Sequence, residues 1–148
     1  MRRMNRREST KAEVLSQAFG PLEVQVLEAI WCVQGPATVR ELHASFPENA
    51  YTTLMTTLDR LHKKGVLTRT KVGRAFAYEA RFARAEMEMR VAARSVQGLL
   101  GAVSGRRELT PLLSCFVDAV SDRDRLLLDD LERLLKAKRT KLVEEEPR

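Results

Sequence analysis

The chain has 148 residues, a formal net charge of +6 at pH 7 and 44% hydrophobic residues. This length suits one globular domain with an additional oligomerisation arm and excludes a large multidomain enzyme, while the positive charge favours phosphate backbones or anionic lipids as partners. No apolar run approaches the roughly 18 to 20 residues of a membrane span and no signal segment follows the basic N-terminus, so we expect a cytoplasmic protein without membrane insertion.

The N-terminal part of the chain divides into a charged stretch and a helix. Residues 1–18 carry several charges without a sustained apolar period, which predicts a basic flexible tail. From Pro21, a residue that suits the first helical turn, apolar residues recur at helical spacing until Gly35 and Pro36 end the helix. The apolar positions are Leu22, Val26, Leu27, Ile30, Trp31 and Val33.

Two further helices follow in quick succession. Thr38 and Glu41 have the spacing of a capping box, in which each side chain accepts a hydrogen bond from the backbone of the other, so a short second helix is expected. Pro47 ends it, and a third helix is predicted from Ala50 or Tyr51 to Lys64, closed by Gly65. The inward positions of the second helix are Val39, Leu42 and Phe46.

The third helix has an apolar side and a hydroxylic, basic side. At about 3.6 residues per turn, the inward face comprises Tyr51, Leu54, Leu58 and Leu61, with Met55 at its edge. The outward face comprises Thr52, Thr53, Thr56, Asp59, Arg60 and Lys63. Each threonine weakens a helix by a few tenths of a kcal/mol, so a requirement other than helix stability favours them. Threonines fit a DNA major groove closely, although a core helix that merely tolerates threonine is the alternative.

A β-hairpin is predicted after Gly65. Its strands are Val66 to Arg69 and Ala75 to Tyr78, and Gly73 supplies the positive φ of the turn. Cations near the tip, namely Arg69, Lys71 and Arg74, suit contacts with phosphate or the minor groove, although charge also protects a hairpin edge from pairing. Three helices followed by a hairpin predict a winged helix-turn-helix DNA-binding domain over residues 19–82, mainly α with a small β-hairpin.

The C-terminal half predicts helices only. One helix is expected from Ala83 to about Val103, a second opening at Thr110-Pro111, and a last one capped by Ser121. Their apolar stripes have no obvious partner within the chain, so residues 83–142 are predicted to form a helical dimerisation region, followed by an acidic tail over 143–148. The predicted dimerisation residues are Val96, Leu99, Leu100, Leu113, Phe116, Val117, Leu127, Leu131 and Leu134.

The residues that usually carry chemistry are sparse. Cys32 and Cys115 stand apart in apolar surroundings and are expected to be buried small hydrophobes. His43 and His62 lack neighbours at ligand spacing, and no nucleophile motif or phosphate-binding loop occurs. We therefore expect no enzyme, no catalytic residues, no metal and no cofactor.

The winged-helix half resembles the penicillinase repressor family, the repressors of β-lactamase and methicillin-resistance operons and their copper-responsive relatives. The segments that carry the resemblance are Pro21 to Trp31, Gly35 to Leu42, Ala50 to Leu61, Lys63 to Gly65 and Lys71 to Tyr78. The resemblance covers Phe19 to Ala80, and beyond it only the helical pattern is similar. It implies a dimer joined through the C-terminal helices that places two recognition helices on a pseudo-palindromic operator and blocks transcription.

The resemblance also implies how repression ends, and here the chain departs from the family. Members are released by proteolysis in the dimerisation arm, commonly at an Asn-Phe bond, after a membrane sensor detects a β-lactam. No Asn-Phe pair occurs around Leu99 to Ala102, which argues against this sensor protease as a partner. The copper-responsive branch carries closely spaced C-terminal cysteines, whereas Cys115 is isolated.

The sequence therefore predicts a homodimeric, sequence-specific repressor that binds a double-stranded DNA operator. The predicted DNA-binding residues are Thr38, Arg40, Thr52, Thr53, Thr56, Arg60, Lys63, Arg69, Lys71 and Arg74. The alternative is a protein-interaction scaffold, in which the winged helix is only a support and the C-terminal arm is the binding surface.

Overall fold

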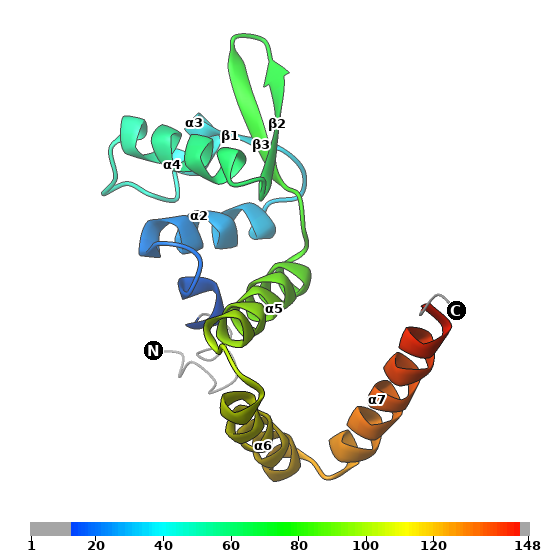
Figure 1. Cartoon of the computed structure of the whole chain (residues 1–148). Helices are drawn as coiled ribbons and strands as arrows, with labels where there is room; N and C mark the ends of the chain where they lie inside the picture. The colour runs from blue at the N-terminus through cyan, green and yellow to red at the C-terminus, as the bar shows by residue number, and fades with distance from the viewer. Residues whose placement is uncertain (1–12, 146–148) are drawn as a thin grey trace. The chain divides into compact units, whose positions relative to one another are not determined.

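The computed structural model describes residues 13–145 and divides into two compact units, Met1–Val96 and Gln97–Arg148 (Figure 1). The predicted boundary between residues 82 and 83 therefore lies too early. Helix α5 (Arg84–Ala102) begins inside the first unit, because its side chains Met87 and Val91 are buried in the core of that unit.

The first unit combines three helices with a small sheet. Its elements are α2 (Pro21–Cys32), β1 (Ala37–Thr38), α3 (Val39–His43), α4 (Tyr51–Lys63), β2 (Leu67–Val72) and β3 (Ala75–Ala80). The sheet is antiparallel with the order β1-β3-β2, and Ala37 pairs with Tyr78 while Leu67 pairs with Ala80. This order confirms the predicted winged helix-turn-helix fold. Strand β1 was not predicted, because two residues are too few to show the alternation of a strand.

Local hydrogen bonds explain where the helices begin. The backbone N–H of Gly20, just before α2, donates to Glu23 Oε2 at 3.0 Å. At α3 the N–H of Thr38 donates to Glu41 Oε2 at 2.7 Å, and Thr38 Oγ1 accepts from the N–H of Glu41 at 3.3 Å. The capping box predicted from the sequence is thus confirmed.

Glycines end α4 and close the hairpin. Gly65 follows α4 with a φ of 78°, and its N–H donates to the carbonyl of His62 at 2.9 Å. Gly73 has a φ of 62° at the first position of the loop between β2 and β3, where hairpin turns favour glycine. The hairpin β2-β3, called the wing below, projects beyond the helices of the first unit (Figure 1).

The core of the first unit lies between α2, α3, α4 and the base of the sheet. Leu54, Leu58 and Leu61 of α4 are completely buried, as predicted. Tyr51 was predicted to face inward, but 45% of it is exposed, because it is the first residue of α4 and its ring packs edge-on against His43 instead. Val33, the residue after α2, is also exposed rather than buried.

The prediction of a flexible tail is wrong for residues 13–18. Residues 13–16 are helical, Leu15 is fully buried, and Val14 packs against the same core. Phe19 lies one helical turn after Leu15 and is buried with it. This apolar stretch is too short to show a helical period among the surrounding charged residues, so the sequence did not predict the helix. The rest of the predicted tail, residues 1–12, lies outside the described residues.

Both cysteines were predicted to be buried, and both are exposed. Cys32 is the last residue of α2, where the core-facing stripe has ended. Both histidines have structural partners, since His43 Nε2 lies 2.8 Å from the carbonyl of Asn49 and His62 Nδ1 lies 3.1 Å from that of Leu67.

The second unit contains helices α6 (Arg106–Arg123) and α7 (Leu126–Glu145). The predicted helix start at Thr110-Pro111 is wrong, because α6 begins about one turn earlier and contains Pro111 within it. Ser121 does not cap the last helix, because it lies within α6. Asp124 caps α7 instead, with Oδ1 accepting from the N–H of Leu126 at 3.0 Å. Helix α7 extends through Glu145, so residues 143–145 belong to it rather than to a separate tail.

Apolar side chains of the second unit remain uncovered within one chain. No residue of α6 or α7 is buried. All the predicted dimerisation residues except the half-buried Leu131 are exposed, from 38% for Leu127 to 68% for Leu134. Among residues 13–145, none of the helices has both the length and the apolarity to cross a membrane.

Candidate nucleic-acid interface

The outward side of α4 carries three exposed threonines, Thr52, Thr53 and Thr56, called the threonine face below. Thr56 Oγ1 donates to the carbonyl oxygen of Thr52 at 2.9 Å. Because this bond uses the only hydroxyl proton, Thr56 presents its methyl group and the acceptor lone pairs of its oxygen to the surroundings. Thr57 makes the same bond to Thr53, at 2.9 Å, but is buried. The predicted division of α4 into an inward and an outward face therefore holds at these threonines.

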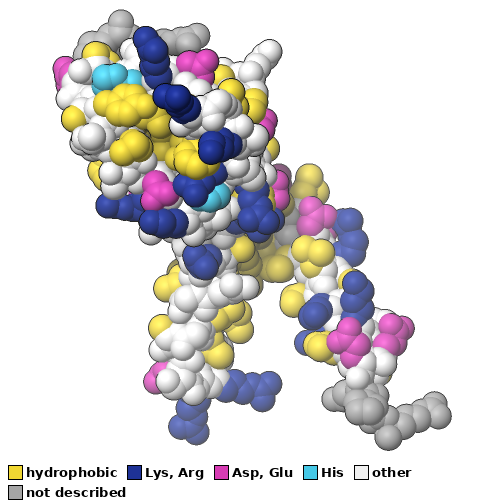
Figure 2. All heavy atoms as spheres, turned by 90° about the horizontal axis from the view of Figure 1, so that it is seen from above, with side chains coloured by type: hydrophobic (Ala, Val, Ile, Leu, Met, Phe, Trp, Pro, Cys, Tyr) yellow, Lys and Arg dark blue, Asp and Glu magenta, His cyan; other side chains and the backbone are white. Residues whose placement is uncertain are grey.

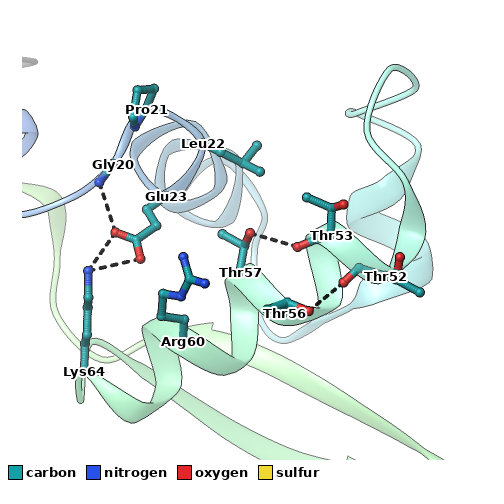
Figure 3. Close-up of a pocket in the computed structure, with 10 residues that line it drawn as sticks. All are labelled: Gly20, Pro21, Leu22, Glu23, Thr52, Thr53, Thr56, Thr57, Arg60 and Lys64. Carbon is teal, nitrogen blue, oxygen red and sulfur yellow. Dashed lines mark hydrogen bonds and ion pairs between the residues drawn. The ribbon is translucent and has the colours of Figure 1, made fainter.

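The threonine face borders an open groove of about 630 Å³ between α4 and the start of α2 (Figure 3). Arg60 extends from α4 toward α2, and Gly20, Pro21 and Leu22 form the opposite wall. Sequence reasoning missed this contribution of α2, because the start of α2 lies about thirty residues before α4 and no pattern in the sequence connects them.

A partly buried ion pair between Lys64 and Glu23 lies on one side of this groove. Lys64 Nζ donates to both carboxylate oxygens of Glu23, at 3.0 and 2.8 Å, and lies 5.2 Å from the centre of the Phe19 ring. Burial by itself would raise the pKa of Glu23, but the hydrogen bonds from Lys64 and Gly20 and the charges of Lys64 and Arg60 outweigh it and lower the pKa. Lys64 therefore holds α4 to α2 and is not a free cation.

This ion pair predicts a loss of stability in acid. Glu23 titrates near 4.5 in the unfolded chain and lower in the folded one, so its contribution is complete above pH 4.5 and disappears as the pH falls through the folded value. Glu23→Gln should cost about 1 kcal/mol at pH 7, the difference between charged and neutral hydrogen bonds, and that difference should shrink below pH 4.5. Urea unfolding of Glu23→Gln and of the unmodified protein between pH 7 and pH 3 measures this difference in the free energy of unfolding.

The control for this experiment is Glu48→Gln, which removes an exposed carboxylate without an ion pair among residues 13–145. Its stability should follow that of the unmodified protein at every pH. A gap between Glu23→Gln and the unmodified protein that stays constant down to pH 3 would contradict the assignment. The quantity to compare is the difference in the free energy of unfolding between the variant and the unmodified protein. Hydrogen bonds from Thr38 and Lys63 also lower the pKa values of Glu41 and Asp59, so the stability of every protein in the series changes in acid.

The predicted DNA-binding cations fall into two groups. Lys63 and Arg69 both pair with Asp59, at 2.8 and 3.2 Å, and the Arg69 guanidinium also lies 4.5 Å from the centre of the Phe76 ring. The other four are exposed and have no ion-pair partner in the part of the chain that the structure describes; they are Arg40, Arg60, Lys71 and Arg74. These four are available to a phosphate without first breaking an ion pair.

Thr38 was predicted both to cap α3 and to contact DNA, and its hydroxyl is occupied by the cap. It is half-buried, and its hydroxyl donates to Glu41 Oε2 at 3.0 Å while accepting from the N–H of Glu41. Both capacities of the hydroxyl are thus engaged in capping α3. Arg40, two residues later, is exposed on the same helix.

Two exposed apolar side chains next to the threonine face were not predicted as part of the site. Tyr51 and Met55 are 45% and 44% exposed and lie one turn apart on α4. Helical periodicity placed them in or beside the core, since their angle on α4 is close to that of Leu58. Figure 2 shows hydrophobic side chains interleaved with Lys and Arg on the side of the first unit that carries the wing. This mixed surface differs from the uniformly charged face of an ordinary solvated helix.

Comparisons with known proteins show which family this chain is similar to. A family model described as "Penicillinase repressor" matches residues 19–137. "Transcriptional regulator BlaI" of Mycobacterium tuberculosis is 36% identical over 122 residues, covering 77% of this chain and 85% of that protein. Among solved structures, the chain is similar to wild-type MarR from E. coli, at 20% identity and a TM-score of 0.45 over 74% of this chain and 85% of that one. MepR of Staphylococcus aureus is similar at 14% identity and a TM-score of 0.45, over 78% and 89%. Scores this low establish no shared arrangement of the whole chain.

Proposed function

Because the chain belongs to the penicillinase repressor family, we propose that it represses transcription by binding a pseudo-palindromic DNA operator as a homodimer. The observation that carries the proposal is the exposed threonine face of α4, which shares a groove with Arg60. The first unit also carries the exposed cations Arg40, Lys71 and Arg74, which have no ion pair among residues 13–145. Membership in a family of transcriptional repressors also argues against an enzymatic activity. Since such a protein acts on chromosomal DNA, a cytoplasmic location is part of the proposal.

Base readout on this surface depends on small side chains. With its proton committed to Thr52, the Thr56 oxygen accepts from exocyclic amino groups of adenine or cytosine, and its methyl group contacts the thymine methyl. Arg60, near the end of α4, and Arg74, in the wing loop, supply phosphate contacts that set the register without reading sequence. Helix and wing together thus combine specific and unspecific contacts.

The uncovered apolar side chains support the homodimer. On α6, Leu113, Phe116 and Val117 are exposed at helical spacing, and α7 presents Leu127 and Leu134. Apolar stripes of this extent normally mark an interface, and a second copy of the chain offers the same stripes in return. Two linked recognition helices then contact half-sites about one helical turn apart, or a multiple of it.

The proposal is tested by competition between DNA sequences. Genomic fragments carrying the gene's own promoter are titrated with the protein at physiological salt, with bulk DNA as competitor. We expect at least one fragment to bind about 10³-fold more tightly than bulk DNA. Equal affinity for all fragments would overturn the proposal. A protein that binds no DNA but captures a partner through Leu99, Phe116 and Leu131 would establish the scaffold function instead.

The role of Thr56 in base readout predicts a change of preference. Thr56→Ala removes both the methyl group and the acceptor, so discrimination at one operator position should fall by roughly 1–3 kcal/mol, while affinity for unrelated DNA stays the same. Fluorescence anisotropy with single-base operator variants measures this. Thr56→Val keeps the methyl shape and shows whether the oxygen is required.

Arg74→Ala is the matched control for Thr56→Ala. Removing one phosphate contact from the wing should weaken binding to every sequence alike and reduce the magnitude of the salt slope by roughly 0.9. If Thr56→Ala also weakens all sequences equally, Thr56 does not read bases.

A further inference from the structure

Asp59 is an acidic side chain on the side of α4 that carries the threonine face. It follows Thr56 by three residues and Thr52 by seven, so all three lie on one stripe of the helix. Its side chain is 36% exposed. A carboxylate in this position repels the phosphates of any duplex that approaches the stripe, so its presence requires an explanation.

Each oxygen of Asp59 holds one cation that sequence reasoning assigned to DNA. Oδ2 pairs with Lys63 Nζ at 2.8 Å, and Oδ1 pairs with Arg69 Nη1 at 3.2 Å. The Lys63 ammonium, through its hydrogen bond, holds the pKa of the Asp59 carboxyl below its usual value despite some desolvation, and the charges of Arg69 and His62 act in the same direction. Asp59 is therefore ionised throughout the neutral range.

Arg69 is held from two sides. Its guanidinium pairs with Asp59 and stacks over the Phe76 ring at 4.5 Å. Because Arg69 lies on β2 and Asp59 on α4, this ion pair connects the wing to α4. Two cations that could each neutralise a phosphate are thereby engaged within the protein.

We propose that Asp59 restrains Lys63 and Arg69 in ion pairs and so lowers the affinity of the protein for DNA of arbitrary sequence. This inference rests on the proposed function as a DNA-binding repressor. Binding to arbitrary sequences depends on the number of phosphates neutralised, whereas operator binding also gains from base contacts. Restraining two cations therefore removes a larger share of the free energy of arbitrary binding than of operator binding.

The test compares Asp59→Asn with the unmodified full-length protein. Two duplexes serve as probes, namely the one that the unmodified protein selects from a randomised pool and a scrambled duplex of the same length. Anisotropy titrations run from about 50 to 300 mM salt. For Asp59→Asn we expect roughly tenfold tighter binding to the scrambled duplex at low salt, and a slope steeper by about 0.9 for each cation released, up to roughly 1.8. The selected duplex should also bind more tightly, by a similar factor.

Two further variants separate release of the cations from a mere change of charge. Glu79→Gln removes one negative charge from β3 of the same wing, where Glu79 has no ion pair among residues 13–145, and should leave the slope unchanged. Combining Asp59→Asn with Lys63→Gln should remove about half of the gain in slope. If Glu79→Gln steepens the slope as much as Asp59→Asn does, restraint of the cations is not the cause.

Other outcomes overturn the proposal in distinguishable ways. Weaker binding of Asp59→Asn to both duplexes with an unchanged salt slope would show that Asp59 only stabilises the contact between α4 and the wing. Loss of preference at one base position with unchanged scrambled binding would make it a direct reader of that base. Failure of the unmodified protein to select any duplex from the randomised pool would instead contradict the proposed function itself. Circular dichroism and the melting temperature show whether Asp59→Asn is folded.

Discussion

Replacing Leu58 with alanine should lower the free energy of unfolding by about 2–5 kcal/mol, the usual cost of a leucine-sized cavity in a packed core. Leu58 is completely buried in the middle of α4, and this helix packs against α2, α3 and β2. Total stability of a domain is only about 5–15 kcal/mol, so a substantial fraction of the variant should be unfolded at moderate temperature. Urea unfolding followed by circular dichroism measures the loss, and DNA binding should fall with the folded fraction.

Two variants serve as controls for Leu58→Ala. Met55→Ala truncates an exposed side chain on the same helix and should change stability by no more than about 0.5 kcal/mol. Leu58→Met nearly conserves the volume and should cost less than about 1.5 kcal/mol. Equal losses for Leu58→Ala and Met55→Ala would show that the inward face of α4 is not the packed one.

Replacing Phe116 with aspartate should convert the dimer to a monomer and reduce operator affinity by roughly 10² or more. Phe116 is 51% exposed on α6 between Leu113 and Val117, and a charge buried in an apolar interface is strongly unfavourable. Each monomer keeps its threonine face, but the second half-site no longer binds as part of the same molecule, so the gain from linkage is lost. Sedimentation velocity gives the oligomeric state, and anisotropy gives the affinity.

The control for Phe116→Asp is Ser114→Asp, which adds the same charge at another exposed position of α6, outside the apolar stripe. It should leave both the dimer and operator affinity unchanged, apart from a small loss through added negative charge. A Phe116→Asp protein that remains dimeric would place the interface elsewhere. A monomer with undiminished operator affinity would show that binding does not depend on the dimer.

Local signals in the sequence sufficed for most of the winged helix. Pro21 and the Thr38–Glu41 capping box locate helix starts, Gly65 and Gly73 locate a helix end and a turn, and each depends only on residues a few positions away. The leucine period of α4 likewise placed Leu54, Leu58 and Leu61 inside and the threonines outside. The family resemblance pointed to the same domain, and the match over residues 19–137 extends beyond it into the helical arm.

Errors arose where the local signal was weak or where a long-range contact overrode it. Ser121 has the side chain of a good cap, yet it remains inside α6 while Asp124 caps α7. Pro111, a residue type that favours the first turn of a helix, lies inside α6 instead of beginning it. Leu15 belongs to the core although the charged residues around it indicate a tail, since the core cluster that includes Leu15 draws most of its residues from α2 and later elements.

By itself the sequence determined helices α2, α3 and α4, the hairpin of the wing, the family resemblance and the threonine side of α4 that stays exposed, because caps, glycines and helical period act through neighbouring residues. Only the tertiary structure decided which cations are free. Lys64 pairs with Glu23 of α2, and Arg69 of the wing pairs with Asp59 of α4, so residues ten or more positions away decide whether these cations are available to DNA. An ion pair between distant elements leaves no period or spacing in the sequence, and folding alone brings its two charges together.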